Sequence, residues 1–388
     1  MDMPIVADDP HAQQHCQQLR DKIIAQIEQQ GGAISFRDYM QRCLYEPGLG
    51  YYATGTHKLG QGGDFTTAPE ISSLFGQSLA APIQDVLLVL DHADILEFGA
   101  GTGKLASDIL SQLKQNDSLP KHYFILETSP DLIERQQALL QQQHADYFAQ
   151  IQWITTIPAT FNGVMLANEV CDAMPVHLLR FESQQIYERY ITVNHGEFCW
   201  QDHTIKDKTL AQQAEQIAAQ LTDYPYQTEV NLNAQYWLKT AVNSLQQGAI
   251  FIVDYGYPFA EFYHAQRQQG SLRCYYRQRA HDNVFFMPGL QDITAHIDFT
   301  SLASVAHQQG AAVAGFHEQA DFLLAAGITE LAAKKQEILP PADWLQYSAA
   351  LKQLLLPSGM GHQFKVLSLT KALAPLSRLA YHDRRYQL

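Results

Sequence analysis

One short segment has the residue pattern of a ligand-binding turn between a strand and a helix. It reads Glu97, Phe98, Gly99, Ala100, Gly101, Thr102 and Gly103. Glycines let a ligand approach the backbone closely, and the first turn of a helix leaves N–H groups without backbone partners. A phosphate-binding P-loop is excluded, because it needs glycine at position 98 and serine or threonine at position 105, where the chain has Phe98 and Leu105. A dinucleotide-binding turn fits poorly, because Lys104 stands where glycine or alanine is needed.

The remaining pattern, an acidic residue followed by three alternating glycines, is typical of enzymes that bind S-adenosylmethionine. This ligand has an amino-acid end, a sulfonium and a ribose, but no phosphate. We expect Glu97 to hydrogen-bond the ammonium group, directly or through water. Glu127, which is followed by Thr128, ends the next apolar run and is expected to bind the ribose hydroxyls. The alternative is a tight turn without a ligand. The second acidic residue argues against it, so the sequence predicts a methyltransferase.

Two further segments are expected to contact the cofactor. A long segment rich in Gly, Tyr and Thr spans residues 46–70, and its end is expected to close over the ligand as a lid. The lid residues are Asp64, Phe65, Thr66 and Thr67. Gln152 and Trp153 follow a third apolar run and are expected to face the adenine. Each has a plainer interpretation, since the segment could be an ordered structural loop and a single tryptophan is more often part of a core.

Apolar runs alternate with amphipathic segments through the middle of the chain. Strands are expected at 94–98, 123–127, 151–154, 163–167, 249–254, 311–316 and 364–369, and the first of them is preceded by helices at 14–30, 35–44 and 71–90. This alternation predicts an α/β fold with a mostly parallel, Rossmann-like sheet that has helices on both faces. We expect an N-terminal helical and lid region over 1–90 and a cofactor-binding domain over 91–388. Segments at about 176–232 and 256–298 interrupt the alternation and are interpreted as inserted caps.

Several segments together resemble the MidA-like class I methyltransferases. The resemblance extends from about 34 to 369 and rests on Tyr45–Tyr52, Gly63–Ile71, Leu96–Gly103, Ala167–Val176, Asp254–Tyr257 and Asp292–Phe299. It implies a seven-stranded sheet whose last strand is antiparallel, with S-adenosylmethionine as the methyl donor. The family includes a mitochondrial protein arginine methyltransferase that assists assembly of respiratory complex I, so the resemblance implies an arginine acceptor on a protein. Cys171 and Met174 depart from the family pattern and are interpreted as packing changes.

An arginine acceptor calls for carboxylates, because a guanidinium stays protonated at ordinary pH. Asn168, Glu169 and Asp172 follow the fourth expected strand, at the edge of the sheet where the cofactor is expected. If a helical turn begins there, positions 169 and 172 share a face. We therefore expect Glu169 and Asp172 to hold the acceptor and take its proton, and Asn168 to shape the methyl environment. The alternative makes Asp172 a helix cap or an ion-pair partner.

Other polar residues give weaker signals. Tyr255, Tyr257 and the segment 292–298 could border an acceptor groove, although ordinary packing accounts for the tyrosines equally well. His177 and His296 are interpreted as structural, because neither has a partner at zinc-ligand spacing. The five cysteines form no close pair, so no metal site is predicted.

Composition narrows the setting and the partners. The chain has 388 residues, 46% of them hydrophobic, and a formal net charge of −14, which disfavours general nucleic-acid binding. No apolar run is long enough to span a membrane, and the first residues lack a secretory or mitochondrial leader pattern. We therefore expect a cytoplasmic protein with a protein substrate, and leave a homodimer open. Two alternatives remain: a methyltransferase for a non-protein acceptor, and a low-turnover assembly scaffold that keeps the cofactor fold.

Overall fold

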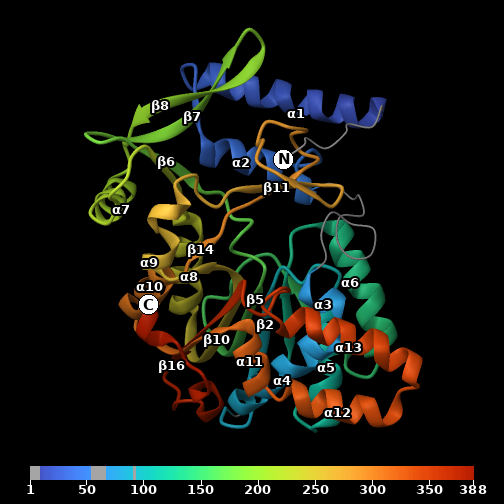
Figure 1. The fold of residues 1–388 in the computed structure, drawn as a ribbon. Coiled ribbons are helices and arrows are strands. Elements are labelled where there is room, and N and C mark those ends of the chain that lie inside the picture. The colour runs from blue at the N-terminus through green and yellow to red at the C-terminus, as the bar shows by residue number, and fades with distance from the viewer. Residues whose placement is uncertain (1–8, 54–66, 91–92) are drawn as a thin grey trace.

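The computed structural model describes residues 9–53, 67–90 and 93–388. Figure 1 shows a large α/β part at the bottom and a smaller cap of strands and helices at the top. The α/β part is built on one sheet from the middle and end of the chain. The cap combines the N-terminal helices with strands from the expected insertions.

The main sheet matches the predicted class. Seven strands lie in the order β15-β16-β10-β5-β2-β3-β4, and the short β14 (Ile297–Asp298) adds an eighth strand beside β10. Only β16 runs against its neighbours, since it is antiparallel to both β10 and β15, whereas the adjacent pairs from β10 to β4 are parallel. The strand bounds are β2 (Asp94–Phe98), β3 (Tyr123–Leu126), β4 (Ile151–Ile154), β5 (Phe161–Asn168), β10 (Leu245–Tyr257), β15 (Ala312–Glu318) and β16 (Phe364–Lys371). The predicted α/β fold with an antiparallel last strand is confirmed.

Helices cover both faces of this sheet, so its central strands are buried on both sides. Residues 248–254 of β10 are buried without interruption. In the helix that follows the glycine loop, Leu105, Ile109 and Leu113 form the buried stripe at helical spacing. One face carries α4 (Ser73–Leu87), α5 (Lys104–Gln115), α6 (Pro130–Gln143), α11 (Gln319–Ala325), α12 (Ile328–Ile338) and α13 (Pro341–Leu355). The opposite face carries α8 (Leu232–Ser244) and α10 (Phe299–Gln308).

Three strands of the main sheet approach unusually closely at one level. Asp94, Gly163 and Gly248 are aligned on β2, β5 and β10. A Cβ on Gly163 would lie 2.0 Å from the carbonyl oxygen of Asp94, and a Cβ on Gly248 would lie 1.8 Å from that of Gly163. Both glycines also have positive φ. These positions in β5 and β10 therefore require glycine for two reasons, the lack of space for a Cβ and the backbone conformation.

The cap joins segments that are far apart in the sequence. Its first sheet contains β1 (Ile34–Ser35), β7 (Ile186–Asn194), β6 (His177–Phe181), β9 (Tyr226–Val230) and β8 (Glu197–Thr204). β1 pairs with β7, which ties the N-terminal segment to the first insertion. The cap helices are α1 (Pro10–Gln29), α2 (Phe36–Tyr45) and α7 (Lys208–Ala218). The second insertion contains α9 (Phe259–Phe262) and a small sheet of β11 (Arg273–Tyr276), β12 (Arg279–His281) and β13 (Asp292–Thr294).

Two helix boundaries differ from the prediction. The first helix begins at Pro10 because the side chain of Asp9 caps it, accepting from the N–H groups of His11 and Ala12. The helix expected over 71–90 is two helices, α3 (Ala68–Ile71) and α4, because Ser72 is extended and its hydroxyl accepts from Leu74 N–H at 3.2 Å. Within the described ranges, no helix combines the length and apolar character that crossing a membrane requires.

Candidate active site

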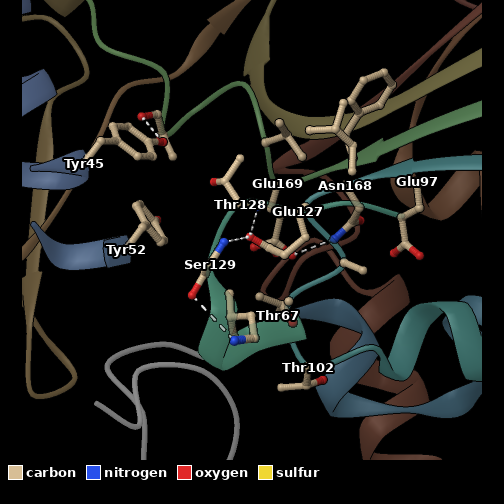
Figure 2. Close-up of a pocket in the computed structure, with 18 of the residues that line it drawn as sticks. Tyr45, Tyr52, Thr67, Glu97, Thr102, Glu127, Thr128, Ser129, Asn168 and Glu169 are labelled. Carbon is tan, nitrogen blue, oxygen red and sulfur yellow. Dashed lines mark hydrogen bonds between the residues drawn. The ribbon is translucent and has the colours of Figure 1, made fainter. Parts of the chain in front are cut away.

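A cavity of about 820 Å³ lies where the cap meets the carboxyl ends of β2, β3 and β5. Its wall includes Glu97 and the glycine loop on one side, and residues of the N-terminal segment on the other. Figure 2 shows this arrangement, with Tyr45 and Tyr52 facing Asn168 and Glu169 across the cavity. The carboxyl edge of a parallel sheet is the usual place for ligands in such folds. The volume lies in the upper part of the range of about 300–1,000 Å³ for small-molecule pockets.

The glycine loop takes a backbone path that side chains would oppose. Gly99, Gly101 and Gly103 have φ angles of +62°, +54° and +85°, all in the left-handed region. A Cβ on Gly103 would come within 3.3 Å of Gln136 on α6, so this glycine also lets the loop pack closely. Phe98 is buried, and the wall of the cavity includes Phe98, Gly99, Ala100, Gly101 and Thr102. The loop therefore presents backbone rather than bulky side chains to a ligand.

Glu97, the last residue but one of β2, is a buried carboxyl in the cavity wall. It is 1% exposed and accepts a hydrogen bond from the Tyr123 hydroxyl at 2.8 Å. Burial raises its pKa to about 7, and the neighbouring Glu127 adds to the shift. A cationic group bound in the cavity would favour the ionised form of Glu97.

Glu127 is held at the start of α6. One of its carboxylate oxygens accepts from the N–H groups of Thr128 and Ser129, at 2.8 and 2.9 Å. The other oxygen accepts from the Gln136 side-chain amide at 3.3 Å. Glu127, Thr128 and Ser129 all line the cavity. Glu127 and Thr128 therefore line the same cavity as the glycine loop, while their roles in binding the cofactor stay predictions.

Gln136 links the parts of this site and was missed by the sequence analysis. Its fully buried amide donates to the carbonyl oxygen of Gly101 at 2.9 Å and accepts from the indole N–H of Trp153 at 2.8 Å. Trp153 thus lies behind the cavity wall and supports the loop through Gln136, and Gln152 is exposed. Neither residue is part of the described cavity wall, so contact of Gln152 and Trp153 with the adenine stays an untested expectation.

Asn168 and Glu169 project from the end of β5 into the cavity. Glu169 has a φ of +54°, a conformation that costs energy for a residue with a side chain. Its N–H donates to Val253 at 2.9 Å, and its carboxylate accepts from Ala68 N–H at 3.4 Å and from the Asn168 amide at 3.3 Å. Burial, and then the negative charge of Asp172, raise the pKa of Glu169 to about 8.

The geometry after β5 differs from the helical turn considered in the sequence analysis. Residues 169–175 form a turn in which Asp254 is the central acceptor. One oxygen of Asp254 accepts from Cys171 N–H at 2.9 Å and Asp172 N–H at 3.2 Å, and the other from Tyr255 N–H at 2.8 Å. The side chain of Asp172 is buried beside the cavity and is not part of its described wall. Its pKa is raised well above its ordinary range by burial and by the charges of Asp254 and Asp292.

The sequence matches a known family over residues 78–317, described as "Putative S-adenosyl-L-methionine-dependent methyltransferase". The chain is 30% identical to the zebrafish (Danio rerio) protein named "Protein arginine methyltransferase NDUFAF7, mitochondrial", with 94% of this chain and 88% of the relative covered. The human (Homo sapiens) protein of that name is 27% identical, with 92% and 83% covered. A Burkholderia thailandensis protein in a crystal structure with S-adenosyl-homocysteine is 37% identical, with a TM-score of 0.93 and both chains fully covered.

The chain belongs to this methyltransferase family. It is therefore an S-adenosylmethionine-dependent methyltransferase, as the glycine loop predicted. The names of the curated relatives place those proteins in mitochondria, so they lend no support to a cytoplasmic setting. That expectation stays a prediction.

The cavity of this methyltransferase suits its cofactor. The glycine loop leaves room at its backbone, and Glu97 and Glu127 supply two carboxyl groups at neighbouring strand ends. The side-chain oxygen of Asn168 is buried and accepts no hydrogen bond from the described residues, although the residue lines the cavity. Such an acceptor suits the ammonium group of the cofactor.

The lid expected over 64–67 is only partly described in the methyltransferase. Asp64, Phe65 and Thr66 lie outside the described residues. Thr67, which precedes α3, lines the cavity. Glu70, within α3, also lines it and accepts from the Thr102 hydroxyl at 2.5 Å. α3 is therefore tied directly to the glycine loop.

Two tyrosines of the cavity wall were missed as site residues of the methyltransferase. Tyr45 ends α2 and Tyr52 lies in a short 3₁₀ helix at Tyr51–Ala53. Their segment, Tyr45–Tyr52, was one of those that carry the family resemblance. The available signal was the adjacent pair Tyr51 and Tyr52 after a Gly-rich turn. Nothing in the local sequence showed that Tyr45 and Tyr52 approach the end of β5.

The remaining candidates occupy structural positions. The ring of His296 contacts the rings of Tyr255 and Tyr257, with centroids 6.1 and 5.4 Å away. His177 lies 2.7 Å from the carboxylate of Glu188. Within the parts of the chain that are described, no group of histidine, cysteine and acidic side chains has the arrangement of a metal site.

Proposed function

We propose that this methyltransferase transfers its methyl group to an arginine side chain of a protein. The supporting observation is the group of carboxylates at the acceptor side of the cavity. Glu169 lines the cavity and Asp172 is buried next to it, and the negative charge of Asp172 helps to raise the pKa of Glu169. Among the described residues, no lysine or arginine comes within ion-pair distance of Glu169 or Asp172. A positively charged acceptor would balance these groups.

The relatives support the same acceptor. Curated relatives from several animals are named protein arginine methyltransferases, and the chain aligns with most of their length. Glu169 follows β5 at the cavity and can accept from a guanidinium, which agrees with an arginine acceptor.

The residues divide the work by position. S-adenosylmethionine, when bound, supplies a methyl group activated by its sulfonium. Glu97, Glu127 and Asn168 are proposed to bind the amino-acid end and the ribose. Glu169 is proposed to orient the guanidinium so that one nitrogen faces the methyl, which is the main requirement of an in-line displacement.

The proton balance also assigns a task to Glu169. When a guanidinium nitrogen forms its bond to the methyl carbon, the bond from that carbon to sulfur breaks and S-adenosylhomocysteine leaves. The acceptor nitrogen then releases one proton. Glu169 is proposed to take this proton. Asp172 is proposed to favour the transfer from behind the cavity wall, because its negative charge raises the pKa of Glu169.

The test uses radiolabelled cofactor and an extract of the source cells. The purified enzyme is incubated with both, and labelled protein is hydrolysed and analysed for methylarginines. Label in methylarginine is the expected result, with little label for Glu169→Gln and normal label for Glu215→Gln, an exposed control on α7. Label that enters small molecules, or another amino acid, would overturn the proposal.

A further inference from the structure

The cavity wall opposite the glycine loop is aromatic. Tyr45 and Tyr52 lie with ring centroids 5.6 Å apart and planes 24° apart. Figure 2 shows them on the left of the cavity, across from Asn168 and Glu169. Glu97 lies at the far right of the same view. The cavity therefore has a glycine-loop end and a tyrosine end, with Glu169 between them.

The hydroxyl groups of both tyrosines are already engaged. Tyr52 donates to a carboxylate oxygen of Asp292 at 3.0 Å, and Tyr45 donates to the carbonyl oxygen of Ala173 at 3.0 Å. Burial raises the pKa of both phenols, so the rings are neutral at ordinary pH. A ligand at this end of the cavity therefore meets ring surface rather than free hydroxyl groups.

The two rings are held firmly in place. Tyr51 is fully buried and packs edge-on against Tyr52, with centroids 5.0 Å apart. Gly50 permits the tight turn between α2 and the 3₁₀ helix that contains Tyr52, since a Cβ on Gly50 would lie 2.5 Å from the backbone nitrogen of Glu46. The hydrogen bonds to Asp292 and Ala173 anchor the other edge of the pair. The ring surfaces are thus fixed before any ligand binds.

The surroundings of the rings favour a cation. The carboxylate of Asp292 lies beside the pair, since it accepts from the Tyr52 hydroxyl, and the charges of Asp292 and Asp172 add to the effect of burial in raising the pKa of Tyr45. Aromatic faces attract cations, and a planar guanidinium can also stack on them, which an ammonium cannot do. In the described part of the chain, no lysine or arginine lies over Tyr45 or Tyr52. The tyrosine end therefore offers an aromatic surface, with acidic side chains beside it, to an incoming group.

We propose that Tyr45 and Tyr52 form the acceptor subsite, in which a guanidinium stacks on a tyrosine ring while Glu169 accepts one of its N–H groups. The inference rests on the proposed function for the group that is methylated. It goes further, because it assigns the enzyme's preference for a guanidinium acceptor over an ammonium acceptor to Tyr45 and Tyr52 of the N-terminal segment. The cofactor end of the cavity is left unchanged by this assignment.

Binding of two small probes tests the subsite without turnover. The probes are Nα-acetyl-arginine amide and Nα-acetyl-lysine amide, titrated by NMR against the full chain with saturating S-adenosylhomocysteine. The wild type should prefer the arginine probe, and Tyr45→Leu or Tyr52→Leu should weaken its binding by about 3- to 30-fold. Tyr52→Phe keeps the ring and should bind nearly normally. Tyr236→Leu, at an exposed position on α8, is the matched control.

Two measurements separate loss of the subsite from loss of the fold. The affinity for S-adenosylhomocysteine and the melting temperature should be close to wild type in each variant. If the leucine variants do not fold, the wild type alone still decides. In a sample protonated only at tyrosine, transferred NOEs should run from ring protons to the side chain of the arginine probe.

The outcomes for the subsite and for the function are distinct. Equal binding of both probes by the wild type, no binding of either, or undiminished binding by folded leucine variants would overturn the subsite. Absence of tyrosine NOEs would do the same. A wild type that binds the arginine probe through the tyrosines, yet labels an acceptor other than arginine, would overturn the proposed function and leave the subsite standing.

Discussion

Glu169 combines three features: a left-handed backbone conformation, a partly buried side chain and a carboxyl whose pKa is raised to about 8. None of these features benefits the fold by itself, since each has a cost in folding free energy. Their coincidence at the cavity is what a residue that contacts the acceptor would show.

The first prediction concerns turnover. Glu169→Gln keeps the shape of the side chain but removes the negative charge, so kcat should fall by about 10²- to 10⁴-fold. The Kd for S-adenosylhomocysteine, measured by calorimetry, should change little, because the glycine loop is untouched. Glu215→Gln serves as the control with the same chemical change. A kcat for Glu169→Gln near that of the control would remove Glu169 from the reaction.

The second prediction concerns pH. Because the pKa of Glu169 is raised to about 8, its ionised fraction grows as the pH rises from about 7 to 9. The kcat/KM of the wild type should therefore increase across this interval. Bound cations favour the ionised carboxylate, so the rise in kcat should occur at lower pH than the rise in kcat/KM. A profile that falls with pH, or one that Glu169→Gln leaves unchanged, would contradict the assignment.

The third prediction isolates the backbone cost at position 169. Glu169→Gly and Glu169→Ala both remove the carboxyl, but only glycine is at ease at a φ of +54°. The glycine variant should be the more stable by about 1 kcal/mol. Chemical unfolding of the two variants at one pH measures this difference. An alanine variant of equal or greater stability would show that the backbone is not strained there.

Among the elements, the close approach of β2, β5 and β10 determines how the carboxyl ends are aligned. Gly163 and Gly248 allow the three strands to approach closely near their amino ends, and the resulting register places Glu97 and Asn168 at the same edge of the sheet. The cavity depends on this alignment, because both residues line it.

The fourth prediction tests that approach. Gly248→Ala should lower the free energy of unfolding by about 1–3 kcal/mol more than Gly196→Ala does. Both glycines have positive φ, but a Cβ on Gly248 would meet Gly163 at 1.8 Å, whereas a Cβ on Gly196 has nothing within 4 Å. Thermal unfolding of both variants gives the comparison. Equal losses would mean that the strands can separate at no cost.

Local sequence patterns predicted the helices and strands better than they predicted the contacts between residues far apart in the chain. The apolar runs located the seven strands of the main path, and the three glycines located the turn after β2. The break at Ser72 was missed because serine is acceptable both inside a helix and at its cap. Gln136 was missed because a glutamine in an amphipathic helix has no local sign of burial.

The acceptor side shows the same limit. Glu169 was found because it follows a strand, yet its left-handed backbone has no signature in its own residue type. The approach of Tyr52 to Asp292 joins positions 240 residues apart, and only the folded cap brings them together. Sequence reasoning therefore reached the cofactor more readily than the acceptor.

For the whole molecule, the fifth prediction concerns stabilisation by ligand. S-adenosylhomocysteine at about 100 times its Kd should stabilise the wild type by about 2.7 kcal/mol. Gln136→Leu removes the amide that joins the Gly101 carbonyl, Glu127 and Trp153, so the same ligand concentration should stabilise this variant less. Thermal shifts across a ligand titration give both values. Gln84→Leu, which changes an amide near the far end of α4, should respond as the wild type does.

The hydrogen bond from Tyr52 to Asp292 also has a consequence for synthesis. A ribosome adding about 5–20 residues per second makes Asp292 roughly 10–50 s after Tyr52. In the first part of that interval, α1 and α2 leave the ribosome before β8 is made, although Trp200 and Phe198 of β8 later pack against Phe36 and Tyr39. Every nascent chain therefore passes through a stage with an exposed apolar N-terminal segment, a kind of surface that favours chaperone binding and self-association.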